Sequence, residues 1–266
     1  MYLRSLIIFF IMVTGIIRSH SQLTVAKVFT DNMMLQCDAK IPVWGHAYPK
    51  TTVVVTQSKL KIQAKANEKG EWQLFLNPTP CGEKTSVTIT SGSEEILLSN
   101  VLYGDVWLCG GQSNMEWYFE SSAGASDELQ NTDNPSIRLL EIPHILSNTP
   151  DNDFSEKLHW DVCSQQSVKQ FSAVGYYFGK YLNENLHKPI GLISDNYGGT
   201  VVEAWTSAQA FSDLPSFKKD IEKLKNVDFE YERRNGDDAQ SNWLAKFYKN
   251  DKGILDTNFI WAGRDV

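Results

Sequence analysis

The stretch Val106-Trp107-Leu108-Cys109-Gly110-Gly111-Gln112-Ser113-Asn114-Met115 decides how this chain folds. Its first four residues are a continuous apolar run, which is typical of a strand in a parallel sheet that is covered on both faces. Two glycines and a polar turn follow, so the strand is expected to end in a tight bend. Because this bend presents the hydroxyl of Ser113, we interpret Ser113 as a candidate nucleophile.

A second strand and glycine turn lie further along the chain. Residues 167–186 predict an amphipathic helix with Ser167 as its N-cap, and residues 190–194 predict a buried strand that leads into Gly198-Gly199-Thr200. The apolar face of the predicted helix comprises Phe171, Val174, Phe178, Tyr181 and Leu182. Strand, helix and strand form an α/β unit, in which both turns lie at the carboxyl edge of the sheet. We therefore expect Ser113 to face the backbone N–H groups of the second turn.

The residues before this unit follow another pattern. From Leu23 to about Asn100 the chain alternates apolar and polar residues in short segments that are separated by turns, which favours an antiparallel β-sandwich. The predicted strands are 43–46, 52–57, 60–66, 72–76, 86–90 and 95–98. Trp44 and Trp72 are interpreted as core residues, with stacking on a sugar as the alternative.

The end of the chain is richer in charge. Residues 216–234 predict a solvated surface helix, which Gly236-Asp237-Asp238 is expected to break. The residues after this point show no clear periodicity.

The N-terminus is typical of a secretory signal. A short positive segment, residues 1–4, precedes the apolar residues 5–17, and small residues follow before Gln22. We expect residues 1–21 to be removed and the mature protein to be secreted or periplasmic, with no membrane association after cleavage; an uncleaved N-terminal anchor is the alternative.

Composition excludes some classes of function and leaves others open. The net charge of −7 is spread along the chain without a basic cluster, which argues against a nucleic-acid partner. The cysteines have no metal-ligand spacing and the chain has no glycine-rich phosphate loop, so we expect neither a metal nor a cofactor. Cys37 and Cys81 are candidates for a disulfide, while four free buried thiols, with Cys109 and Cys163, are the alternative.

Ordered motifs between Leu23 and Ser207 resemble the sialate O-acetylesterase family, a branch of the SGNH (GDSL-like) hydrolases. The matching segments are residues 104–117, 171–179, 190–193 and 198–206. The resemblance implies that Ser113 is the catalytic nucleophile and that the N–H groups of Ser113 and Gly199 form the oxyanion hole. It also implies removal of acetyl groups from an O-acetylated carbohydrate through an acetyl-enzyme, without a metal.

Two further blocks of that family do not occur in this sequence. They are a Trp-Tyr-Gln-Gly-Glu motif, which completes the oxyanion hole, and an Asp-x-x-His motif, which supplies the general base. His144 and His159 lie between the first two matching segments, and neither is part of an Asp-x-x-His motif. Since a serine hydroxyl needs a base, we expect a C-terminally truncated chain that is weakly active or inactive alone, its partner a missing C-terminal half.

The resulting prediction is a signal peptide at residues 1–21, a β-sandwich at 22–101 and a partial, three-layer SGNH-hydrolase-like domain with a parallel sheet at 102–266. Its expected function is the hydrolysis of acetyl esters on sugars, with O-acetylated sialic acid as the preferred substrate. An acetylxylan-type esterase and a noncatalytic carbohydrate-binding protein remain alternatives. The acetyl position, the general base and the oligomeric state stay open.

Overall fold

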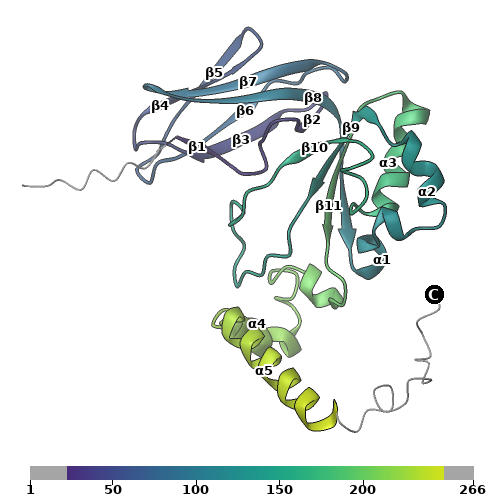
Figure 1. Ribbon diagram of the computed structural model, residues 1–266. Helices are drawn as coiled ribbons and strands as arrows, with labels where there is room; N and C mark the ends of the chain where they lie inside the picture. The colour runs from purple at the N-terminus through teal and green to yellow at the C-terminus, as the bar shows by residue number, and fades with distance from the viewer. Residues whose placement is uncertain (1–22, 249–266) are drawn as a thin grey trace, which may run out of the picture.

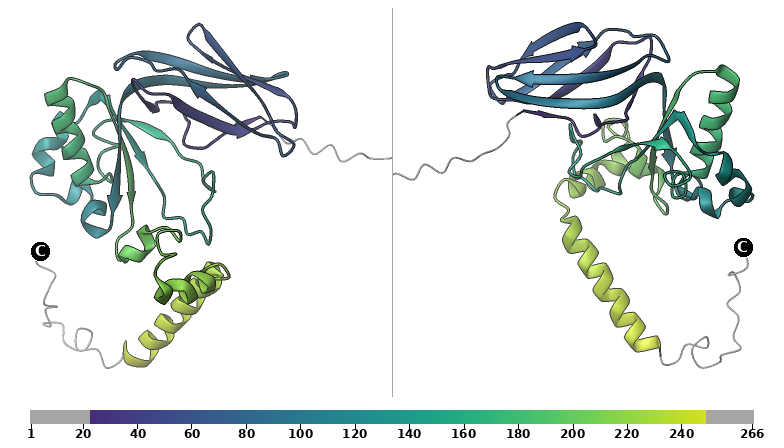
Figure 2. Two further views of the ribbon diagram at one scale, coloured as in Figure 1. Left: turned by 180° about the vertical axis from the view of Figure 1, so that it is seen from behind. Right: turned by 45° about the horizontal axis from the view of Figure 1, so that its top comes forward.

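The computed structural model describes residues 23–248, so the predicted signal peptide lies outside the described residues. The first part of the chain forms two facing sheets (Figures 1 and 2). Their strands are β1 (Thr24–Val25), β2 (Met34–Gln36), β3 (Ile41–His46), β4 (Thr52–Gln57), β5 (Leu60–Lys65), β6 (Glu71–Leu76), β7 (Lys84–Ser91) and β8 (Glu94–Gly111). The alternating pattern therefore predicted β3 to β7 to within a few residues, because one face of each sheet is buried, whereas β1 and β2 were not predicted.

The inward-facing side chains of the two sheets form a common apolar core. Val53, Val55 and Ile89 are fully buried in it, and Trp72 is 2% exposed, as predicted for a core residue. Trp44 is only partly buried, and its ring packs edge-on against Phe29 with the centroids 5.0 Å apart.

β8 is the element that connects the sandwich to the rest of the molecule. Its first half pairs antiparallel with β7, and residues 105–111 pair in parallel with β11 (Ile190–Asn196). The predicted domain boundary between residues 101 and 102 falls inside this continuous 18-residue strand. Both parts therefore share one sheet, in which the order is β10-β9-β11-β8-β7-β4-β5.

The second part of this sheet is mixed rather than wholly parallel. β9 (Asn134–Glu141), β11 and β8 are parallel, whereas the edge strand β10 (Trp160–Cys163) runs antiparallel to β9. Three helices lie on one face: α1 (Ser113–Glu116), α2 (Ala125–Glu128) and α3 (Ala173–Leu186) (Figure 1). The opposite face is bordered by the segment 142–159 and by the short 3-10 helix η3 (Val202–Trp205). The three-layer arrangement therefore stays a prediction.

The start of α3 corrects the sequence prediction. The helix begins at Ala173, with Ser172 as its N-cap and the Ser172 hydroxyl accepting the Gly175 N–H at 3.0 Å, rather than at Ser167. The preceding residues pair with the chain after α1, where the Phe171 carbonyl accepts the Phe119 N–H at 2.9 Å. Backbone groups that are used in this pairing are not available to a helix.

The buried face of α3 is also not the predicted one. Tyr176 and Gly179 lie inside, whereas Val174, Phe178 and Tyr181 are 42%, 39% and 65% exposed. The small residue at position 179 allows the helix to approach the sheet closely, which turns the larger apolar row toward solvent. The prediction was wrong for these three residues, because it considered side-chain size and not how closely the helix approaches the sheet. Phe171 is buried and Leu182 packs against the core, as predicted.

Two helices follow near the C-terminal end of the described chain: α4 (Lys218–Leu224) and α5 (Phe229–Phe247). The predicted break at residues 236–238 was wrong, since these residues lie inside α5, and the interruption instead precedes Asp228, whose side chain caps α5 by accepting the Tyr231 N–H. α5 is solvated along its length, as predicted, with none of its residues buried. Among residues 23–248, none of the helices combines the length and hydropathy of a membrane span.

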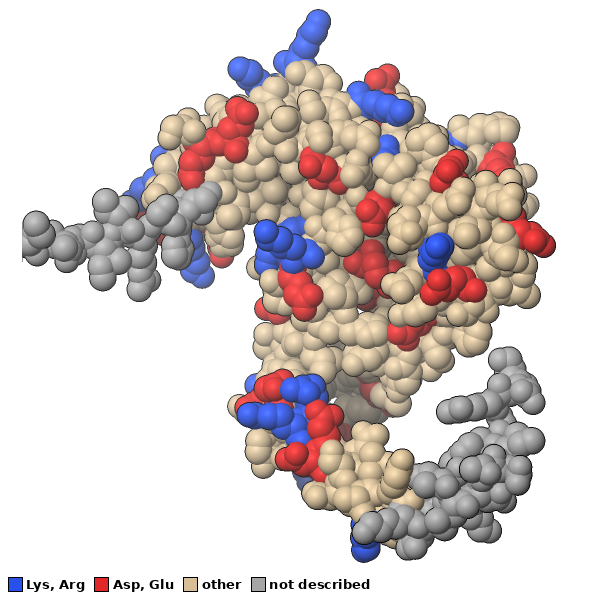
Figure 3. Space-filling model, viewed as in Figure 1, with Lys and Arg blue, Asp and Glu red and all other residues tan. Residues whose placement is uncertain are grey.

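The structure decides between the two alternatives for the cysteines and shows how the charged side chains are distributed. Cys37 and Cys81 form a disulfide, while Cys109 and Cys163 are free and buried. On the face shown in Figure 3, lysine and arginine side chains are scattered among aspartate and glutamate rather than gathered in a patch.

Candidate active site

Ser113 lies where the parallel half of β8 ends. After Gly111 the chain turns at Gln112 into the short helix α1, in which the Gln112 carbonyl accepts the N–H groups of Met115 and Glu116. Ser113 is the first residue of this helix and is exposed to solvent. The sequence thus folds here as predicted, with a strand that delivers a serine to the carboxyl edge of the sheet.

The second glycine turn meets the first. The Tyr197 N–H donates to the Gly111 carbonyl at 3.0 Å, so the chain leaving β11 stays paired with the chain leaving β8. A Cβ placed on Gly198 would lie 3.5 Å from both Cα and Cβ of Ser113. The structure therefore brings together the two turns that the sequence predicted to be neighbours.

Gly199 occupies the outer position of this turn. Its φ of +79° lies in the left-handed region that favours glycine, and a Cβ there would meet no atom within 4 Å. Within residues 23–248, the N–H groups of Ser113 and Gly199 make no hydrogen bond. Their role as oxyanion donors stays a prediction. An oxyanion donor needs an N–H that no other acceptor uses, and both N–H groups meet this requirement.

Two residues that the sequence analysis did not assign complete the cluster. Glu116 Oε2 accepts the Gly198 N–H, and Glu116 Oε1 lies 3.4 Å from His144 Nε2. The His144 ring stacks on the Tyr197 ring, with centroids 3.9 Å and planes 8° apart. Loops after three parallel strands, β8, β9 and β11, therefore converge on the Glu116 carboxylate.

The sequence held a weak signal for His144. Glu141-Ile-Pro-His144 has the spacing of the Asp-x-x-His motif, with Glu in place of Asp. Glu156 to His159 and Glu184 to His187 share that spacing, so it does not discriminate among the three histidines. The sheet order separates His144 from His159. His144 follows β9, whereas His159 directly precedes β10, the edge strand on the far side of β9 from β8, and contacts Asp161 at 3.3 Å.

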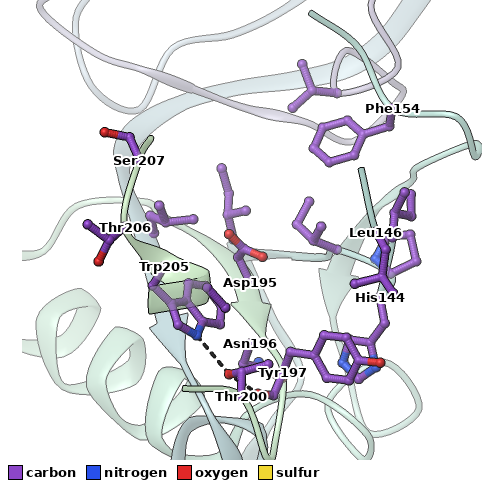
Figure 4. Close-up of a pocket in the computed structure, with 17 residues that line it drawn as sticks. His144, Leu146, Phe154, Asp195, Asn196, Tyr197, Thr200, Trp205, Thr206 and Ser207 are labelled. Carbon is purple, nitrogen blue, oxygen red and sulfur yellow. Dashed lines mark hydrogen bonds between the residues drawn. The ribbon is translucent and has the colours of Figure 1, made fainter. Parts of the chain in front are cut away.

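A cavity of about 720 Å³ borders this cluster (Figure 4). Leu108 and Ile193 line it, and their neighbours Trp107 and Leu192 contact α3 on the other face of the sheet. His144 and Tyr197 lie side by side at its edge. Trp205 lines it as well, fixed by a 2.8 Å hydrogen bond from Nε1 to Thr200 Oγ1. Trp205 is 42% exposed and Trp117 is 53% exposed, so neither is a core residue.

An acidic side chain lies within the same cavity. The pKa of the Asp195 carboxyl is raised above its usual range, because partial burial disfavours the charged form. The electrostatic interaction with nearby His144 opposes this rise but is the smaller effect. Perturbed carboxyl groups beside a cavity are typical of functional sites, although ion-pair networks also produce them.

In the part of the chain that the structure describes, one cluster could bring three metal ligands together, namely Cys37, Asp38 and Cys81. Its two sulfur atoms are joined in the disulfide, so this cluster does not fit a metal ion.

Several known proteins are similar to this chain. Residues 103–229 match the family model described as carbohydrate esterase, sialic acid-specific acetylesterase. The human sialate O-acetylesterase is 33% identical over 203 residues, which cover 70% of this chain and 39% of that protein. The mouse sialate O-acetylesterase is 34% identical over 182 residues, which cover 62% of this chain and 34% of that protein.

A solved structure is similar as well. A carbohydrate acetylesterase from Xanthomonas citri superposes with a TM-score of 0.69 at 29% identity, covering 71% of this chain and 43% of that chain. The present chain thus spans about two fifths of the length of the relatives it matches.

Proposed function

Residues 103–229 of this chain belong to the sialic acid-specific acetylesterases among the carbohydrate esterases, and from this we propose that the protein removes acetyl groups from sugar hydroxyls, with O-acetylated sialic acid as substrate. The observation that carries the proposal is the packing of the Ser113 turn against the Gly198–Gly199 turn, with two N–H groups left unused. An ester carbonyl at that point would meet a hydroxyl and two amide donors at once.

The reaction follows from these positions. The Ser113 hydroxyl attacks the acetyl carbonyl, and the negative charge that develops on the carbonyl oxygen is stabilised by the N–H groups of Ser113 and Gly199. Collapse of this intermediate breaks the bond between the acetyl carbon and the sugar oxygen, which takes up the proton that the Ser113 hydroxyl gave up. Water then hydrolyses the acetyl-serine, which releases acetate and restores the Ser113 hydroxyl. No step requires a metal or a cofactor.

The proposal also concerns how fast this chain alone hydrolyses the ester. A serine hydroxyl is a poor nucleophile without a base, and the sequence has no Asp-x-x-His motif. We therefore propose that this chain turns over slowly by itself.

Export is part of the proposal. The apolar N-terminal segment supports secretion or transport to the periplasm, where acetylated glycans would be accessible. Detection of mature protein that begins at Gln22 in the medium or periplasm, by N-terminal sequencing, tests it.

The enzymatic test uses the chain from Gln22 to Val266. We expect a fluorophosphonate probe to label the wild-type protein at one site, which mass spectrometry places on Ser113, and Ser113→Ala to abolish labelling. Acetate release from an activated acetyl ester should be slow and should also depend on Ser113. A folded wild-type protein that the probe leaves unlabelled would contradict the proposal.

One observation favours a second candidate, noncatalytic carbohydrate binding. A cavity of about 670 Å³ lies over β3 and β6, where Trp44, His46 and Glu71 border it. An aromatic ring beside polar side chains is suited to a sugar. Retention on an immobilised glycan without labelling of Ser113 would favour binding, whereas hydrolysis of acetylated xylan in preference to acetylated sialic acid would favour the acetylxylan-type esterase.

A further inference from the structure

We infer that Glu116 is a positioning residue: its carboxylate holds the second glycine turn against Ser113 and so determines that Gly199, not Gly198, offers its N–H to the reacting carbonyl. This inference rests on the proposed function and adds a residue that the esterase motif does not explain.

The contacts of Glu116 are the first step of the argument. Glu116 lies three residues after Ser113, in the same helical turn, and its side chain is 25% exposed. One carboxylate oxygen accepts the Gly198 N–H and the other lies 3.4 Å from His144 Nε2. A hydrogen bond to a carboxylate is stronger than one between neutral groups, so Glu116 ties the turn firmly to the helix that begins with Ser113.

The remaining N–H groups of the turn are the second step. Among residues 197–200, Tyr197 donates to the end of β8, Gly198 donates to Glu116, and Thr200 donates back to the Tyr197 carbonyl at 3.4 Å. Gly199 alone of these four has an unused N–H, and it is the exposed residue of the turn. Without the Glu116 carboxylate, two adjacent N–H groups would compete for the ester oxygen and the turn would lose its attachment to α1.

The charge of Glu116 is the third step. A carboxylate beside a developing oxyanion would oppose the reaction unless other groups neutralise it. One oxygen of Glu116 accepts the Gly198 N–H, and the other lies 3.4 Å from Nε2 of His144, whose ring stacks on Tyr197. The Gly198 N–H therefore offsets part of the electrostatic cost of placing the Glu116 carboxylate beside the turn.

The test compares Glu116→Ala with Glu116→Gln. The amide oxygen of the glutamine can still accept the Gly198 N–H, whereas alanine removes the acceptor. Glu120→Ala serves as the matched control, because Glu120 is an exposed carboxylate in the adjoining 3-10 turn. Two quantities are measured: the chemical shift of the Gly198 amide proton, and the rate at which a fluorophosphonate labels Ser113.

We expect Glu116→Ala to move the Gly198 amide proton upfield and to slow labelling at least about tenfold, because a small displacement of a donor is costly. Glu116→Gln should restore most of the rate, and Glu120→Ala should change neither quantity. An unchanged Gly198 amide and an unchanged rate in Glu116→Ala would overturn the inference, as would equal losses in the Ala and Gln variants. If the wild type itself is not labelled, the proposed function fails, but the Gly198 resonance still tests the hydrogen bond.

Discussion

Gly179 of α3 lies directly against Leu192 of β11: a Cβ at position 179 would come within 2.5 Å of Leu192 Cδ1. The contact sets the distance between α3 and the sheet that carries both glycine turns. It also explains why α3 buries Tyr176 and leaves Phe178 partly exposed.

Replacing Gly179 by alanine should therefore destabilise the protein. The added methyl group forces the helix away from the sheet or Leu192 out of its rotamer, at a cost of about 1–3 kcal/mol. Urea unfolding followed by circular dichroism measures the loss. Gly236→Ala is the control, because Gly236 is exposed inside α5 and its Cβ would meet no atom, so alanine should be neutral or improve the helix by about 0.5–1 kcal/mol. A Gly179→Ala variant as stable as the wild type would contradict the close packing.

The Cys37–Cys81 disulfide should contribute to the stability of the sandwich. Its two residues are 44 apart in sequence, a loop whose closure in the unfolded chain is worth about 4 kcal/mol in the chain-entropy account. The double variant Cys37→Ala/Cys81→Ala should accordingly melt at a lower temperature than the wild type. The difference should vanish when both proteins are measured fully reduced, and a persisting difference would point to lost packing rather than to the bond.

The two free thiols should be unreactive while the protein is folded. Burial raises the pKa of Cys109 to about 11 and that of Cys163 to about 12, with nearby carboxylates adding to the shift. Because a thiol reacts as its thiolate, almost none of which is present at pH 8, iodoacetamide should not modify the native protein. In denaturant the pKa values return to normal and mass spectrometry should find two additions per chain. Modification at the same rate with and without denaturant would show that these residues are accessible.

The N-cap of α3 provides a local test. The Ser172 hydroxyl accepts the Gly175 N–H inside the protein, so Ser172→Ala leaves that donor buried without a partner. We expect a loss of about 1–2 kcal/mol in the free energy of unfolding. Faster hydrogen exchange confined to the first turn of α3 would identify the cause, and unchanged exchange there would argue against it.

Most of the fold was predictable because it depends on local patterns. Strict alternation located β3 to β7, and the apolar run before Ser113 located the parallel half of β8. The errors arose where long-range contacts decide the structure. Ser167 is a reasonable N-cap by residue type, but the pairing of Phe171 with Phe119 delays the helix to Ala173.

The sequence also predicted one part of the candidate site and missed another. Ser113 and the second glycine turn follow from two strand ends that any parallel sheet places at one edge. His144 belongs to an irregular segment between β9 and β10, whose path depends on contacts with the sandwich such as the 2.9 Å hydrogen bond from Trp44 Nε1 to the Asn152 carbonyl. No local pattern encodes that path, so the partner of Glu116 could be found only in three dimensions.

The continuity of β8 has a consequence for any attempt to dissect this protein. A fragment that starts after Leu102 would keep Ser113 but remove the β7 and β2 partners of the strand that carries it. The sandwich therefore holds the strand that carries Ser113, and joining the later residues to a different N-terminal unit would require a replacement for these strand pairings.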